Sequence, residues 1–227
     1  MGQCNIHARE LAEQPSCEAA QDGHGAGPET WDRLPSAQMK IYTRKGDSGT
    51  TGLLFGGDRV SKGSLRTDAY GSTDEAVSAL GLARASIGAA TDRTEARLAE
   101  LTVRLQRELF VVGAELATHV ERRDRLTPGV SLVSAEMVTA LEAEIDALEA
   151  DYPMPTEFVL PGESMAGAAF DLARTSVRRA ERRAVALSAD GGLPDSQVVP
   201  YLNRLADLLF VVARAADGGF RPVRARE

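Results

Sequence analysis

Residues 173–183 read ARTSVRRAERR, which places five arginines within eleven positions. This spacing predicts a helix, because side chains about 100° apart bring one set of small residues onto a single face. The predicted apolar stripe consists of Ala173, Val177, Ala180 and Ala184. Arg174, Arg178 and Glu181 are expected on the flank of that stripe, whereas Arg179 and Arg183 point away from it.

The arginine-rich helix allows two interpretations. Guanidinium groups beside a packing face are fork-shaped donors that suit phosphate oxygens. Alternatively, the segment is a solvated basic face held by Glu–Arg pairs, as charge runs on helices commonly are. The whole chain has a net charge of −7 and a pI near 5.1. It therefore has no general attraction to nucleic acid or anionic membrane, and any anion site on this helix is a focused one.

Composition predicts one globular domain that follows a tail. The 227 residues are 43% hydrophobic and 26% charged, which is enough for one substantial core. Residues 1–38, rich in Gly, Pro and Gln, are expected to form a flexible tail, and 39–227 the helical domain. Both cysteines, Cys4 and Cys17, lie in that tail, at spacings from His7 and His24 that match no zinc pattern. Without a disulfide framework, signal peptide or membrane-length apolar run, a cytoplasmic location is expected.

The segment 40–62, KIYTRKGDSGTTGLLFGGDRVSK, contains five glycines and all three lysines of the chain. The glycines exclude a regular helix. Hydroxyl and cationic side chains beside flexible backbone suit a loop that wraps phosphates with N–H groups. It has neither the Walker A nor the dinucleotide-binding pattern, and a flexible surface loop is the alternative.

Hydrophobic periodicity predicts five helices, and hence an all-α, up-and-down bundle. Ser72 and Glu75 suggest a capping box for the first, and Ser134 a cap for the third. The expected helices are 72–86, 93–118, 134–150, 164–188 and 198–216.

The last predicted helix carries a second polar face, formed by Asn203, Asp207, Phe210 and Arg214. Asp207 and Arg214 could form an exposed ion pair of little energetic value. An aromatic residue among polar groups suggests instead a wall that meets a ligand or another subunit.

Four blocks of sequence occur in the order found in one enzyme family. They are YTRKGDSGTTGL followed by RVSK, then AYGSTDE, then FVLPG followed by ARTSVRRAERR, and finally YLNRLADLLFVVAR. Over residues 39–222 the chain resembles the PduO-type ATP:cob(I)alamin adenosyltransferases. The resemblance implies a ferritin-like five-helix bundle and a homotrimer with ATP bound between neighbouring subunits. It also implies a possible reductase and an adenosylcobalamin-dependent enzyme as partners, and neither nucleic acid nor membrane.

The resemblance assigns site residues position by position. It implies catalytic roles for Asp74, Arg174 and Arg178, with Arg174 pairing with Asp74, and a cobalamin pocket walled by Phe158 and Phe210. No metal is expected on protein side chains, because Mg²⁺ would bridge phosphates. The implied ATP-binding residues are Thr43, Arg44, Lys45, Gly46, Thr51, Gly52, Lys62, Arg178, Arg179, Glu181, Arg182 and Asn203.

The chemistry of such a transfer fits this residue set. Cobalt(I) attacks the 5′ carbon of ATP and expels triphosphate, so the protein needs cations and alignment but no general base. Phe158 below the corrin would exclude an axial ligand and make cobalt(II) easier to reduce. The chain departs from the family pattern at Glu163, Val77 and His119, where Gly, Asn and Pro are usual. An adenosylcobalamin carrier for a mutase, and a non-catalytic scaffold that binds acidic partners, are the alternative functions.

Overall fold

The computed structural model describes residues 42–88 and 92–224. The predicted tail 1–38 lies outside these residues. The described part contains five α-helices and one 3₁₀ helix, so the all-α prediction is confirmed. The helices are α2 (Leu65–Ile87), α3 (Arg93–Leu116), η1 (Val120–Arg125), α4 (Ala135–Asp151), α5 (Met165–Ala189) and α6 (Val198–Asp217). The strands are β1 (Thr50–Thr51), β2 (Val60–Ser61), β3 (Val159–Leu160) and β4 (Arg221–Pro222).

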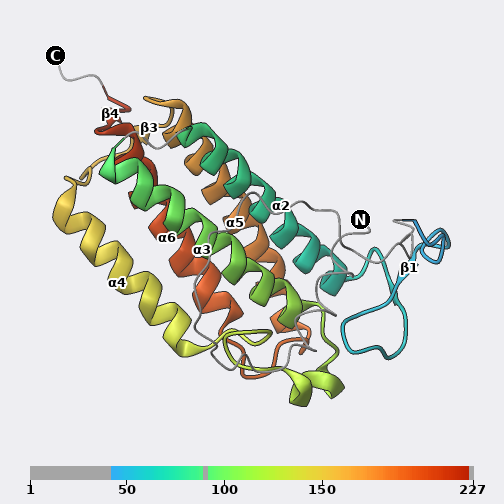
Figure 1. The fold of residues 1–227 in the computed structure, drawn as a ribbon. Coiled ribbons are helices and arrows are strands. Elements are labelled where there is room, and N and C mark those ends of the chain that lie inside the picture. The colour runs from blue at the N-terminus through green and yellow to red at the C-terminus, as the bar shows by residue number, and fades with distance from the viewer. Residues whose placement is uncertain (1–41, 89–91, 225–227) are drawn as a thin grey trace, which may run out of the picture.

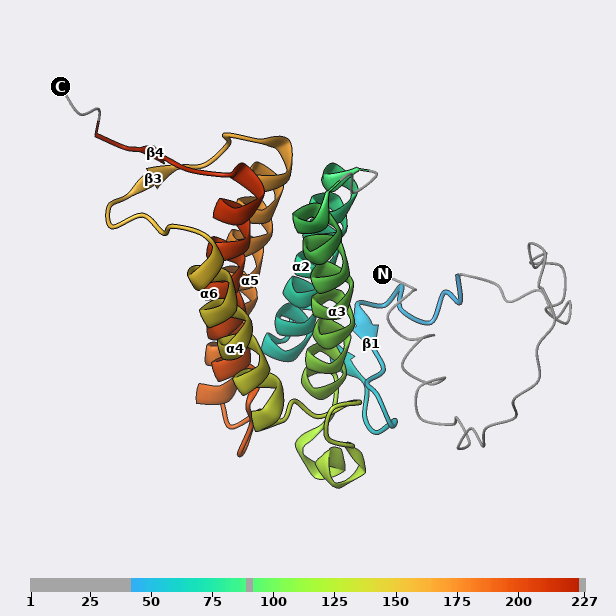
Figure 2. The same cartoon turned by 60° about the vertical axis from the view of Figure 1, so that its left-hand side comes forward.

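The long helices run side by side as an up-and-down bundle (Figures 1 and 2). Helix α5 packs against both α2 and α6, α3 packs against α2, and α4 lies on α6. Figure 2 shows α4, α5 and α6 grouped on one side of the bundle, with α2 and α3 on the other. Leucines of α3 and α6 fill the space between these two groups of helices. Among the described residues, no helix is both long enough and apolar enough to cross a membrane.

Small residues let α5 approach α2 closely. The predicted stripe of Ala173, Val177, Ala180 and Ala184 is completely buried. Helix α2, which packs against α5, also carries a row of buried alanines, Ala69, Ala76 and Ala83. Short side chains on both helices shorten the distance at which their backbones can pack. The predicted stripe is therefore confirmed. Its small side chains explain why the α2–α5 interface is the most extensive in the bundle.

Helix α2 begins earlier than the sequence pattern predicted. Its N-cap is Ser64, whose hydroxyl oxygen accepts a hydrogen bond from the Thr67 amide. Ser72 lies inside the helix, where its hydroxyl donates to the Asp68 carbonyl over 2.8 Å. A serine that bonds back one turn is compatible with a helix interior, so the capping box predicted at Ser72 is wrong. Ser134 precedes α4 as expected, but its side chain makes no capping hydrogen bond.

Two short antiparallel ladders lie at opposite ends of the bundle (Figure 1). β1 pairs with β2 at Thr50↔Ser61, inside the glycine-rich segment. β3 pairs with β4 at Leu160↔Arg221, which joins the loop before α5 to the segment after α6. The sequence pattern gave no strand prediction here, because two-residue strands are too short to show alternation.

One buried arginine joins three segments at the end of the bundle that carries the glycine-rich segment. Arg66 donates to the carbonyl oxygens of Leu116 (2.8 Å), Thr118 (2.7 Å) and Gly192 (2.9 Å). Burial lowers the pKa of Arg66, and the nearby Arg123 charge lowers it further. These carbonyls belong to the end of α3 and to the α5–α6 turn, so one guanidinium fixes both against the start of α2.

Candidate functional site

The glycine-rich loop, residues 42–62, is folded through turns and the β1–β2 ladder. Arg44 and Gly49 have φ values of 58° and 80°, in the left-handed region. The Gly49 amide donates to the Gly46 carbonyl over 3.1 Å, and the Lys62 amide donates to the Gly49 carbonyl over 2.9 Å. These hydrogen bonds and the ladder give the backbone of the loop a defined shape.

Arg59 is the cation that holds this loop together. Its Nη2 donates to the carbonyl oxygens of Lys45 and Thr50, each over 2.8 Å. Its Nε donates to Thr50 Oγ1 over 3.0 Å. Arg44, Lys45 and Lys62 are exposed. The loop thus uses one guanidinium internally and leaves three cations available for an anionic ligand.

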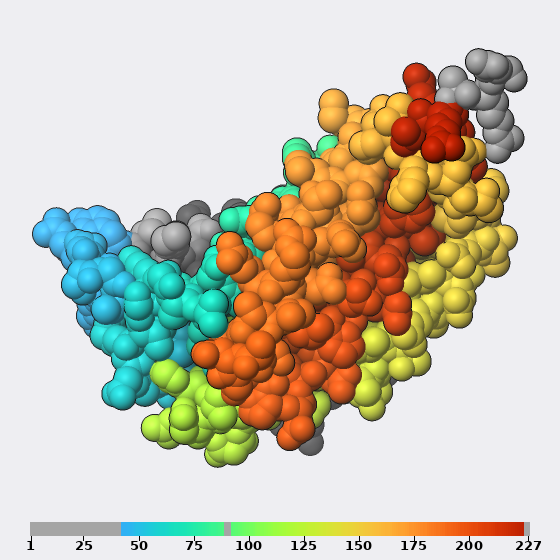
Figure 3. All heavy atoms as spheres, turned by 180° about the vertical axis from the view of Figure 1, so that it is seen from behind, coloured from blue at the N-terminus to red at the C-terminus, as the bar shows by residue number. Residues whose placement is uncertain are grey.

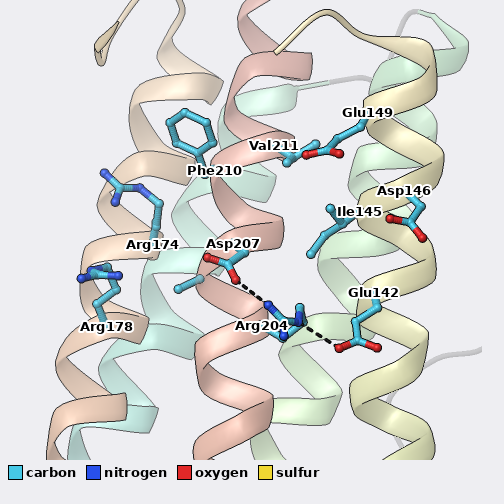
Figure 4. A pocket seen from close by; sticks show the side chains of 11 residues that line it. Glu142, Ile145, Asp146, Glu149, Arg174, Arg178, Arg204, Asp207, Phe210 and Val211 are labelled. Atoms are coloured by element: carbon cyan, nitrogen blue, oxygen red, sulfur yellow. Dashed lines mark hydrogen bonds and ion pairs between the residues drawn. The ribbon is translucent and has the colours of Figure 1, made fainter. Parts of the chain in front are cut away.

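A hollow of about 720 Å³ lies between α4 and α5 over α6 (Figures 3 and 4). Its α5 side carries the side chains of Arg174 and Arg178, close to Phe210 of α6. Its opposite side carries acidic residues of α4. Arg204 bridges the floor, donating to Glu142 over 3.1 Å and to Asp207 over 2.8 Å. The hollow is lined by Glu142, Ile145, Asp146, Glu149, Arg174, Arg178, Arg204, Ala206, Asp207, Phe210 and Val211.

The arginines of α5 divide between two faces, as the periodicity predicted. Arg179 and Arg183 form ion pairs with Glu75 and Asp68 of α2. Arg178 faces the hollow and forms no ion pair with any described residue, although its carbonyl accepts a hydrogen bond from Arg182. The hollow side of the helix therefore keeps an uncommitted guanidinium.

Glu181 connects the arginine-rich helix to the last helix. Its Oε1 accepts a hydrogen bond from Asn203 Nδ2 over 3.0 Å. The two residues were predicted to share a nucleotide site, and the fold brings their side chains into contact. Thr43, Arg44, Lys45, Gly46, Thr51, Gly52 and Lys62 likewise share the glycine-rich loop.

The exposed Asp207–Arg214 pair, one of the two interpretations of this helix face, does not form. Arg214 is only 2% exposed and points toward α5, where it pairs with Asp171 over 2.5 Å. Asp207 instead pairs with Arg204. Sequence periodicity placed Arg214 on a polar face because arginine is charged. The carboxylate that neutralises it, Asp171, belongs to another helix, so the sequence around Arg214 does not reveal the pair.

Arg174 and Asp74 do not pair within the chain. Asp74 is exposed on α2, whereas Arg174 donates through Nε to Asp171 over 3.0 Å. The Arg174–Asp74 pair implied by the resemblance stays a prediction.

Phe158 directly precedes β3, and Figure 1 shows β3 at the far end of the bundle from the β1 loop. Its side chain is 89% exposed, but its carbonyl accepts a hydrogen bond from the Val223 amide over 2.9 Å. Glu163, the departure from the family pattern, forms a two-pronged pair with Arg221 over 2.8 and 3.0 Å. The backbone of this segment is thus held while an aromatic ring faces outward.

A family model described as Cobalamin adenosyltransferase matches residues 41–216 of the chain. This chain belongs to the cobalamin adenosyltransferase family. A corrinoid adenosyltransferase from Bacillus subtilis is 42% identical over 180 residues, covering 79% of this chain and 87% of the relative. One from Citrobacter freundii is 42% identical over 178 residues, covering 78% and 95%.

Solved structures agree with this cobalamin adenosyltransferase assignment. A variant PduO-type ATP:corrinoid adenosyltransferase from Lactobacillus reuteri, complexed with cobalamin and ATP, superposes with a TM-score of 0.72 at 28% identity. The match covers 83% of this chain and 98% of that one. The resemblance proposed from the four sequence blocks is therefore confirmed.

Sequence reasoning missed two groups of this adenosyltransferase. Arg59 stood among the loop cations without a separate role, although the loop is built on it. Asp171 and Asp217 attracted no prediction, yet both carboxylates contact Arg214. Asp171 precedes Arg174 by three residues, so an i,i+3 ion pair was readable from the sequence.

Proposed function

We propose that this protein transfers the 5′-deoxyadenosyl group of ATP to cob(I)alamin and releases triphosphate. The observation that carries the proposal is the pair of cationic surfaces in a chain of this family. One is the loop with exposed Arg44, Lys45 and Lys62, and the other is the α5 wall with the uncommitted Arg178. Both surfaces suit a phosphate chain.

The reaction requires this kind of site. Two electrons of cobalt(I) form the Co–C5′ bond, and the C5′–O5′ bond breaks with its electron pair leaving on the triphosphate oxygen. No proton moves in that step, so a general base is unnecessary. The activation free energy depends mainly on aligning C5′ with cobalt and on stabilising the negative charge that collects on the leaving group. Arginine and lysine donors that are in place before reaction supply that stabilisation.

Magnesium is expected to enter with the nucleotide. Within residues 42–88 and 92–224, no group of three or more His, Cys, Asp or Glu side chains could hold a metal ion. Phosphate oxygens and water are the ligands Mg²⁺ prefers in such complexes. The protein would then contact the Mg²⁺–ATP complex through its cations.

The positions of the two ends support a site shared between copies of the chain. The glycine-rich loop and the Phe158 segment lie at opposite ends of one bundle (Figure 1). A single chain therefore does not bring its predicted phosphate loop to its predicted corrin wall. A homotrimer in which the loop of one subunit meets α5 and Phe158 of the next would do so. The expected setting is the cytoplasm, with a reductase and an adenosylcobalamin-dependent enzyme as partners.

The chemistry is tested by anaerobic incubation of the purified protein with Mg²⁺–ATP and chemically reduced cobalamin. We expect the visible spectrum to change to that of adenosylcobalamin, with one triphosphate released per cofactor formed. Omission of ATP is the control. A protein that binds both substrates but forms no Co–C bond would overturn the proposal and favour the carrier function.

The shared site is tested by mixing two inactive variants, Lys62→Ala and Arg178→Ala. Each variant damages a different surface, so a site that draws its loop from one chain and α5 from another regains function in mixed trimers. For random 1:1 mixing, about a quarter of sites are intact and activity should reach about a quarter of wild type. Continued inactivity of the refolded mixture would show that both surfaces act within one chain.

A further inference from the structure

A buried carboxylate lies between two arginines where α5 packs on α6. Asp171 is 5% exposed, and its two oxygens have different partners. Oδ1 accepts from Arg174 Nε over 3.0 Å, and Oδ2 accepts from Arg214 Nη2 over 2.5 Å. A buried carboxylate is stable only when its charge is matched and its lone pairs are used, and both conditions hold here.

Asp171 is itself held in place from the start of α5. Arg214 Nη2 also donates to Asp217 Oδ2 over 3.1 Å. Asp217 Oδ1 accepts from both the amide and the hydroxyl of Ser164, the α5 N-cap, each over 2.8 Å. Gly167 leaves room for this carboxylate, because a Cβ atom at that position would overlap Asp217. The network is thus anchored at both ends and cannot rotate freely.

Arg174 is the member of this network that reaches the hollow. Its side chain is 29% exposed and lines the hollow beside Phe210 and Arg178 (Figure 4). Because Nε is committed to Asp171, the bond fixes the plane of the guanidinium and leaves its two terminal nitrogens for other partners. A long, mobile side chain is thereby restricted before any ligand arrives.

The same network supports Phe210. The Cζ atom of Arg214 lies 5.3 Å from the centre of the Phe210 ring, a cation–π distance. Arg214 is nearly inaccessible, and its Nε has no hydrogen-bond partner among the described residues. Its contacts with the two aspartates and with the ring therefore account for its position.

We infer that Asp171 is a positioning residue for the adenosyl transfer, which it serves by fixing the guanidinium of Arg174 toward the hollow. This inference rests on the proposed function. Asp171 has no role in charge transfer itself. It reduces the conformational freedom that Arg174 must lose when the transition state forms, and a misplaced cation is costly there.

Asp217 provides the matched control, because both aspartates neutralise Arg214 and only Asp171 contacts Arg174. We expect Asp171→Asn to lower kcat roughly 10- to 100-fold with little change in the KM for ATP, since a small misplacement affects the reacting geometry. Asp217→Asn should lower the thermal midpoint and reduce kcat much less than Asp171→Asn, roughly threefold, because it acts on Arg174 only indirectly, through Arg214 and Asp171. Equal kcat losses in the two variants would overturn the inference and indicate a purely structural cluster.

A double-mutant cycle separates positioning from general damage. In an Arg174→Ala background, Asp171→Asn should have almost no further effect on kcat, because its target is gone. If it costs as much in that background as in wild type, Asp171 does not act through Arg174, while the proposed function stands. Asp171→Glu keeps the charge but moves the carboxylate, so we expect an intermediate loss of kcat. This variant tests the inference if Asp171→Asn folds poorly.

A second measurement does not depend on activity. With arginine-selective ¹⁵N labelling, the Arg174 Nε–H resonance is assigned by its loss in Arg174→Lys. We expect its hydrogen exchange to be protected in wild type and in Asp217→Asn, and roughly tenfold faster in Asp171→Asn. An unchanged exchange rate in Asp171→Asn would refute the inference about Asp171, whether or not the protein is active. Failure of the wild-type protein to form adenosylcobalamin would instead refute the proposed function.

Discussion

The ammonium group of Lys62 lies directly over Gly46. A Cβ atom built on Gly46 would come within 2.9 Å of Lys62 Nζ and 3.2 Å of Lys62 Cε. Glycine at this position therefore leaves room for the ammonium group of Lys62, the residue directly after β2. The loop is shaped so that the lysine crosses it, and this relationship can be tested by a single methyl group.

Gly46→Ala should displace Lys62 and raise the KM for ATP about tenfold, because the cation is moved from its place over the loop. Stability should change little, since the obstructed atom is the free end of a flexible side chain. Steady-state kinetics with varied ATP measures the effect. Gly63→Ala is the control, because its Cβ atom would meet Ser61 Oγ at an ordinary 3.7 Å. If both variants have the same KM, the proposed role of Lys62 over Gly46 is wrong.

Arg178→Ala should reduce transfer about a hundredfold or more, since it removes a cation that is free to meet the triphosphate. Arg183→Ala removes an equal charge five residues further along the helix, but that arginine is bound to Asp68 over 2.9 Å. It should retain nearly full activity. Single-turnover formation of adenosylcobalamin is the measurement, with size-exclusion chromatography to confirm assembly. Full activity of the Arg178→Ala protein would contradict the site.

Phe158→Ala should impair turnover that starts from cobalt(II) much more than turnover from reduced cobalt(I). The ring is 89% exposed, so its loss creates no cavity and the thermal midpoint should stay within about 1 °C. Parallel assays with the two cobalt states, using Phe220→Ala as the aromatic control, measure the effect. Equal losses from both states would remove the argument that Phe158 excludes an axial ligand.

Glu163→Ala should change corrinoid affinity less than about twofold. The carboxylate is already paired with Arg221, so little net charge faces a ligand, and an exposed pair contributes about 0–1 kcal/mol to stability. Arg221→Ala leaves Glu163 unpaired and should weaken binding more. Titration of the corrinoid absorbance distinguishes the two, and a large effect of Glu163→Ala would show that Glu163 contacts the ligand directly.

The stability of the protein should fall above about pH 10 through Tyr201. Burial raises the pKa of the Tyr201 hydroxyl well above its ordinary value. The negative charge of Glu108, which accepts a hydrogen bond from that hydroxyl over 2.7 Å, raises the pKa further. The folded state then keeps a proton that the unfolded state releases, so its contribution is complete below about pH 10 and declines as the pH rises past that value.

Chemical unfolding of wild type and Tyr201→Phe measures this contribution. At pH 7 the variant should be about 1 kcal/mol less stable, because Glu108 loses a hydrogen bond. The difference should shrink between about pH 10 and pH 11.5. A constant difference across that range would exclude Tyr201 as the source.

Much of the bundle was predictable because its helices are long and strongly periodic. The apolar stripe of α5 and the bounds of α3 and α6 followed from residue spacing, to within two residues at each end. The start of α2 was missed, because Ser72 followed by Glu75 has the spacing of a capping box whether or not a helix already precedes it. Only the earlier cap at Ser64 settles the matter.

The site was predicted less completely than the fold. Motif blocks located the loop and the arginine helix, but Asp171 and Arg214 are 43 positions apart in sequence. Their pairing depends on the rotation of α6 about its axis, and a rotation set by packing cannot be read from either segment alone. For the same reason the sequence could not exclude an exposed pair between Asp207 and Arg214, which have other partners in the structure.

The three hydrogen bonds from Arg66 to backbone carbonyls have a consequence for the order of folding. Its carbonyl partners lie 50, 52 and 126 positions along the chain. Contacts between such distant positions form slowly, because the intervening chain must be ordered first. Helix α2 can pair with α3 early, but this guanidinium is fully satisfied only after the turn between α5 and α6 has closed. We therefore expect the end of the bundle beside the glycine-rich loop to be the last part to consolidate during refolding.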